Sequence, residues 1–143
     1  MAVILYTSGY EVEVVMDMSR AGKGLAVLLV AYVVADILLT PPARLETRDP
    51  ALVTPVGFVT LGLLFLGLLL AVISVVLLIR GSRRASVLAV IAAVLYFPAV
   101  IAEWSGHFSK LSPPPAIATV EVIQAFIAVL VIVFAIIEKQ AHR

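Results

Sequence analysis

The 143-residue sequence contains no cysteine, which excludes disulfides, thiol redox chemistry and thiolate metal sites. Histidine is almost as scarce. With only His107 and His142, one chain cannot hold a bis-histidine haem inside a bundle. The net charge is +1, and the short Arg80–Arg84 stretch is the only local concentration of basic residues. Nucleic-acid binding therefore has no support, and a phosphate-binding glycine loop is absent as well.

Charged residues make up only 13% of the chain and hydrophobic residues 63%, whereas soluble domains are about one quarter charged and about half apolar. Lipid is therefore the expected solvent. A membrane-crossing helix needs about 18 to 20 apolar residues, and four runs reach or approach this length. We expect spans at about residues 23–40, 56–79, 85–104 and 115–138. The predicted fold class is an all-α integral membrane protein, with four transmembrane helices in an up-down-up-down antiparallel bundle.

The distribution of Lys and Arg predicts the orientation in the membrane, because cytoplasmic segments carry an excess of both. Seven of the ten lie before the first span, between spans two and three, or after the fourth, while the other two connections hold Arg44, Arg48 and Lys110. We therefore expect a cell-membrane protein with cytoplasmic N- and C-termini.

Residues 21–143 are expected to form one transmembrane domain, preceded by a short cytoplasmic segment, residues 1–20. In that segment the alternation Tyr10–Val14 is typical of a short strand or an unstructured tail. The start could also be misassigned, with translation beginning at Met16 or Met18.

Small and polar residues recur at helical spacing in every span and indicate which faces turn inward. On this basis seven side chains form a candidate polar cluster near the outer ends of the spans: Tyr32, Asp36, Tyr96, Glu103, His107, Glu121 and Gln124. In the inner half, the pattern places only Ser74 on an inward face.

Charges in the hydrocarbon region cost about 2.5–3.5 kcal/mol each, so inward carboxylates are functional candidates. Together they need a cation, which could be His107, Arg44, Arg48 or Lys110. Three interpretations remain open. The cluster is helix-end polarity and structural glue, a site for a headgroup, quinone or small cation, or a centre for catalysis or proton coupling. The residue types suit a carboxylate-rich Mn or Fe site, but no Glu-x-x-His motif is present, and we assign no metal, cofactor or catalytic residue.

The favoured interpretation is a non-catalytic accessory or structural membrane subunit. The alternative is a small-ligand binding or transport protein with an outer-facing polar pocket for a quinone, lipid headgroup or cation. The expected partners are the lipid bilayer and either further copies of the chain or a larger membrane complex.

Overall fold

The computed structural model describes residues 3–7, 10–14, 19–40 and 43–141. Helices dominate it, and four are long and apolar enough to cross a membrane. These are α1 (Arg20–Leu38), α2 (Pro55–Ile79), α3 (Arg84–Trp104) and α4 (Pro115–Ala141), with a 3-10 turn, η2 (Pro50–Leu52), before α2. The four apolar runs of the sequence correspond to these four helices.

The N-terminal segment forms two strands, β1 (Val3–Thr7) and β2 (Tyr10–Val14). They pair antiparallel, with Val3 opposite Val14 and Thr7 opposite Tyr10. Of the two interpretations of the alternation over residues 10–14, the strand is the one confirmed.

The helices begin and end at residues suited to those positions. Ser19 and Thr54 cap α1 and α2, each accepting a hydrogen bond from a backbone N–H three residues on. Pro55 and Pro115 occupy the first helical positions, where the missing N–H costs nothing. Gly106, with φ +72°, ends α3, and the N–H of His107 then returns to the carbonyl of Ala102 at 2.8 Å. This Schellman arrangement turns the chain sharply out of the helix.

The four helices form a closed ring of neighbours, in which α2 packs most extensively on α3, and α1 lies between α2 and α4. Small side chains make much of the core. The buried set includes Ala71, Ala85, Ala89, Ala92, Ala93 and Ala128, together with Leu25, Leu29, Tyr32, Tyr96 and Val131. The outer surface consists largely of exposed Val, Ile, Leu and Phe. The inward faces predicted from small and polar residues are thus largely confirmed.

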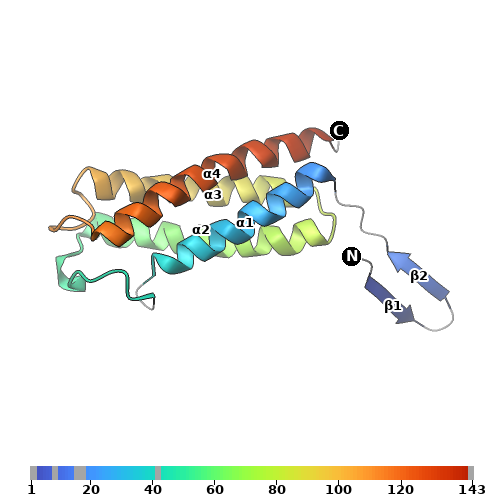
Figure 1. Cartoon of the computed structure of the whole chain (residues 1–143), viewed down its shortest axis with the longest axis horizontal. Helices are drawn as coiled ribbons and strands as arrows, with labels where there is room; N and C mark the ends of the chain where they lie inside the picture. Colours follow the sequence, from blue (N-terminus) through green and yellow to red (C-terminus); the bar gives the residue numbers. More distant parts are fainter. Residues whose placement is uncertain (1–2, 8–9, 15–18, 41–42, 142–143) are drawn as a thin grey trace.

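Both longer connections lie at the same end of the bundle, which we call the loop end (residues 43–54 and 105–114) (Figure 1). The start of α1, the α2–α3 turn and the end of α4 lie at the opposite end (Figure 1). Backbone bonds join the two connections: Thr54 N donates to Phe108 O at 2.9 Å, and Lys110 N donates to Leu52 O at 3.1 Å. The loop end is therefore an ordered cap over the bundle.

Gly57 is required where this cap meets α2. A Cβ at this position would overlap the carbonyl oxygen of Phe108 and lie 2.7 Å from Val53 Cγ1. Since neither group is the free end of a flexible side chain, we predict that Gly57→Ala destabilises the fold by about 1–3 kcal/mol, the usual cost of overpacking. Thermal unfolding in detergent measures this as a lower midpoint.

Gly62→Ala is the matched control, because Gly62 lies on the same helix, is exposed and has nothing within 4 Å of an added Cβ. Alanine is the better helix former, so this variant should unfold at the same temperature or higher. Equal losses in the two variants would contradict the close approach at Gly57.

Candidate functional site

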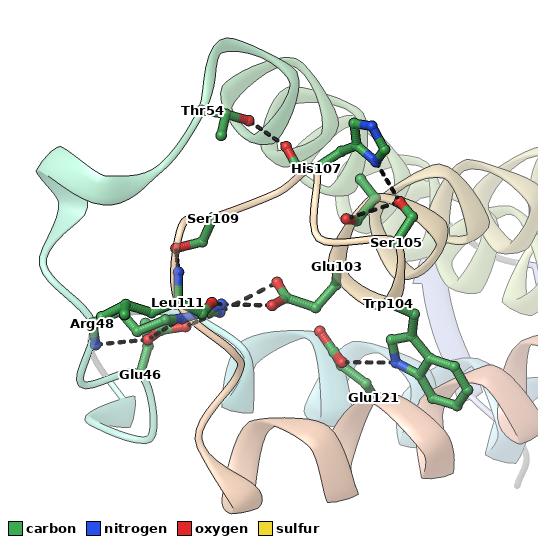
Figure 2. A network of polar contacts seen from close by, with 11 residues as sticks. Glu46, Arg48, Thr54, Glu103, Trp104, Ser105, His107, Ser109, Leu111 and Glu121 are labelled. Atoms are coloured by element: carbon green, nitrogen blue, oxygen red, sulfur yellow. Dashed lines mark hydrogen bonds and ion pairs between the residues drawn. The ribbon is translucent and has the colours of Figure 1, made fainter.

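Arg48 lies at the centre of the loop end and joins three separate segments of the chain (Figure 2). Its guanidinium meets the carboxylate of Glu103 in a two-pronged pair, with Nη1 to Oε1 at 2.5 Å and Nη2 to Oε2 at 3.2 Å. Nε and Nη2 also donate to the two carboxylate oxygens of Glu46, at 3.0 and 2.7 Å. Nη1 donates in addition to the carbonyl of Leu111 at 3.1 Å. A guanidinium has five N–H donors, and these five bonds use all of them.

This network, which we call the Arg48 clamp (Glu46, Arg48, Glu103 and the Leu111 carbonyl), is largely shielded from solvent. The Arg48 side chain is 6% exposed and that of Glu103 3%. The guanidinium also lies 5.4 Å from the ring centre of Phe108, within the range of a cation–π contact. Removing one partner of a buried ion pair is costly, and here a single guanidinium serves two carboxylates, so both depend on Arg48.

The clamp shifts the pKa values of its two loop members in opposite directions. Partial burial would raise the pKa of Glu46, but hydrogen bonds from Arg48 and its positive charge outweigh burial and hold that pKa below 4.5. Burial would lower the pKa of Arg48, yet the bonds and charges of Glu46 and Glu103 raise it. Both groups are therefore held in their charged forms.

Glu121 of α4 lies beside the clamp and is also buried. Its Oε2 is 3.4 Å from the indole Nε1 of Trp104, and its backbone carbonyl accepts a 2.7 Å bond from the Tyr96 hydroxyl. A cavity of about 40 Å³ is lined by Glu103, Glu121, Arg48 and Tyr96 among others. A water needs about 10–15 Å³ measured in this way, so the cavity has room for about three waters.

Asp36 and Gln124 form a second polar pair between α1 and α4. The Gln124 amide Nε2 donates to Asp36 Oδ1 at 2.7 Å, and both side chains are buried. Tyr32, one turn before Asp36, donates its hydroxyl to the carbonyl of Ala92 at 3.1 Å. The Tyr32 ring meets that of Tyr96 edge to face, with centroids 6.3 Å apart. Among the described residues, Asp36 Oδ2 and Gln124 Oε1 have no hydrogen-bond partner.

The inward position predicted for His107 is wrong. Its side chain is exposed, and the ring turns toward Ser105, with Nδ1 2.9 Å from Oγ, and away from Glu103 (Figure 2). The reason is that α3 ends at Trp104 and the left-handed conformation of Gly106 then turns the chain away, so His107 does not follow Glu103 on a helical face. The other six predicted side chains are all buried.

Two polar residues of the opposite end were missed. Ser86 and Glu138 are buried there in addition to Ser74, and Ser19 Oγ donates to a carboxylate oxygen of Glu138. Glu138 falls at the very edge of the fourth expected span, where a carboxylate is usually taken for a solvated helix end. Of the three loop cations considered, Arg48 is the one that reaches the cluster. No sequence pattern marks Glu46 as part of the cluster, because its role depends on a contact with Arg48, two residues away in an irregular loop.

Taken together, the side chains at the loop end can hold charges and fix two connections to one another. In the described part of the chain, no three His, Cys, Asp or Glu side chains converge in a way that could hold a metal ion. A comparison with family models, curated proteins and solved structures found no match to this chain.

The ion pair between Arg48 and Glu103 predicts a large loss of stability when Arg48 alone is replaced. Arg48→Met leaves the buried Glu103 carboxylate unmatched, so we expect a loss of about 3–5 kcal/mol in stability. Arg48→Lys should recover only part of it, since an ammonium cannot reproduce the planar fork. The double variant Arg48→Met/Glu103→Leu should unfold at a higher temperature than Arg48→Met, because it also removes the more deeply buried of the two carboxylates that lose their cation.

Lys110→Met is the control, since it removes an exposed cation from the facing connection. Thermal unfolding of the purified variants in detergent provides the comparison. If Arg48→Met behaves like Lys110→Met, the clamp contributes nothing to the fold.

The lowered pKa of Glu46 predicts that the stability of the fold depends on pH in the acidic range. Because its pKa is lowered in the folded chain, the unfolded chain binds more protons, and stability from this group falls as the pH drops. The stability difference between wild type and Glu46→Gln should be fully present above about pH 4.5, the ordinary pKa, and vanish as the pH falls through the lowered value. Unfolding midpoints of both proteins from pH 3 to pH 7 measure it. A difference that does not change over this range would contradict the pairing.

Proposed function

We propose that the chain is a non-catalytic accessory or structural subunit of the cell membrane, with its four helices crossing the bilayer in an up-down-up-down antiparallel bundle. The length and apolar surface of the helices support insertion. The excess of Lys and Arg outside the loop end supports cytoplasmic N- and C-termini, since both termini leave the bundle at the opposite end.

The observation that carries this proposal is that the Arg48 clamp is complete. All five guanidinium donors bind groups of the chain itself, and Glu103 is held from both oxygens. A catalytic carboxylate needs freedom to take or give a proton to a substrate, which an arginine-bound carboxylate lacks. The adjoining cavity of about 40 Å³ is too small for a quinone ring or a lipid headgroup. The loop end therefore favours a structural role.

The exposed faces of the helices support a role in assembly. Large apolar side chains cover the outside of α2, including Phe58, Val59, Phe65 and Leu69. Lipid tails or a neighbouring apolar helix would cover such a face equally well, because neither provides a hydrophobic driving force over the other. Close packing against a further copy or another membrane subunit is the structural role we propose.

Native mass spectrometry of the tagged chain, released from membranes in mild detergent, tests the proposal. We expect a discrete assembly heavier than the 15.2 kDa chain, either a homo-oligomer or a complex with other subunits. The same assembly should form with the Arg48→Met/Glu103→Leu variant, because a structural clamp can be replaced by apolar packing. A chain that is released only as a monomer would contradict the proposal.

A second candidate function is small-ligand binding or transport, and a separate observation favours it. Asp36 is 4% exposed, and its Oδ2 has no hydrogen-bond partner among the described residues. A buried carboxylate in an apolar helix is costly unless something matches it, so a ligand that does so would be bound.

A further inference from the structure

The Asp36–Gln124 pair contains more hydrogen-bond acceptors than donors to satisfy them. One amide N–H of Gln124 is used between them, and the Gln124 side chain also bonds the Tyr32 hydroxyl. Within the described residues Asp36 Oδ2 and Gln124 Oε1 are both left without a partner. Both free atoms are oxygens, so a molecule that satisfies them has to supply N–H or O–H groups.

The nearby donors of the chain are already engaged. The Tyr32 hydroxyl donates to the Ala92 carbonyl, and the Tyr96 hydroxyl to that of Glu121. Thr40, one turn beyond Asp36, donates its hydroxyl to the carbonyl of Ile37. Arg48, the buried cation of the loop end, has no donor left. The missing partner of Asp36 is therefore not supplied by these groups.

A groove between α1 and α2 lies against Asp36, whose Oδ2, unpartnered among the described residues, is itself covered. Its volume is about 110 Å³, and it is lined by Asp36, Leu39, Thr40, Leu61, Leu64, Phe65 and Leu68. Asp36 is the only ionisable residue in that lining. Phe65 is 56% exposed on the outer surface of α2, so the groove reaches the side of the bundle. Its opening faces the region that lipid would occupy in a membrane-inserted bundle.

We propose that this groove binds an amphiphile with an ammonium head that carries at least one N–H and with an apolar body. The Asp36 side chain turns toward the groove and pairs with the head, and the body lies along Leu61, Leu64, Phe65 and Leu68 and enters from the side of the bundle. The proposal rests on the second candidate function, ligand binding, and names its ligand class. An apolar cavity of about 150 Å³ holds benzene, so 110 Å³ accommodates the head and first methylenes of such a molecule.

The chemistry of the groove argues against the other ligands considered. An oxidised quinone presents carbonyl acceptors, which cannot satisfy two further acceptor oxygens. A phosphate headgroup is an anion and would be repelled by Asp36. A small inorganic cation such as Ca²⁺ needs six to eight oxygen ligands, whereas this lining is mostly leucine. An organic cation satisfies both the carboxylate and the apolar wall.

Binding of dodecylammonium to the full chain in phosphatidylcholine nanodiscs tests the proposal by titration calorimetry. We expect saturable binding with one site per chain. Asp36→Asn should weaken it at least ten-fold, since the amide keeps the shape but removes the charge. Dodecanol, a neutral donor, and dodecyltrimethylammonium, a cation without N–H, should each bind at least ten-fold more weakly than dodecylammonium.

Two tryptophan variants keep the test valid if Asp36→Asn does not fold. Leu68→Trp fills the groove and should abolish saturable binding, whereas Val72→Trp, one turn further along α2 and exposed, should leave it unchanged. If dodecanol binds as tightly as dodecylammonium, the ammonium class is wrong, while ligand binding at this site stands. If no probe binds saturably to the wild type, the inference and the second candidate function are both overturned.

Discussion

The guanidinium of Arg48 is the one charge on which the loop end depends. It donates hydrogen bonds to Glu46 in its own connection, to Glu103 at the end of α3 and to the carbonyl of Leu111 in the other connection. These groups are up to 63 residues apart in the chain, so no local preference could hold them together. Both carboxylates depend on this one guanidinium, so the loss of Arg48 would leave each of them without its cation. The backbone bonds between the two connections and the close fit of Phe108 over Gly57 lie at the same end of the bundle.

The helices were predictable because their signal is local. Long apolar runs mark all four helices within a few residues of their bounds, and Pro55 and Pro115 stand at the first positions of α2 and α4. The small residues that mark the inward face of α2, such as Gly67 and Ser74, are buried for the reason that predicts them: helices in an apolar surrounding gain by close backbone approach. Glu138 was missed, since a carboxylate at a helix end carries the same local pattern whether it is solvated or, as here, bound by Ser19.

The site was predictable where it lies on helices and not where it lies in connections. Asp36 and Gln124 follow the periodicity of their helices, so spacing alone places them inward. His107 shows the limit of this argument, because one glycine in a left-handed conformation changes the direction of the next side chain. Glu46 and the choice of Arg48 over Arg44 or Lys110 depend on how an irregular segment folds back. Tertiary contacts determine the path of that segment, so the sequence shows no periodic pattern that would predict it.

The Arg48 clamp and the Asp36–Gln124 pair differ in whether their polar atoms find hydrogen-bond partners within the chain. In the Arg48 clamp every donor meets an acceptor within the chain, so a ligand could enter only by breaking bonds that already exist. At the Asp36–Gln124 pair two acceptor oxygens lack donors among the described residues, and Asp36 is one of the residues that line an apolar groove. An unmatched buried carboxylate lowers the stability of the free protein, and a cation that matches it regains that free energy on binding. The clamp therefore fixes the two connections to the end of α3, and the groove is where a ligand would gain most.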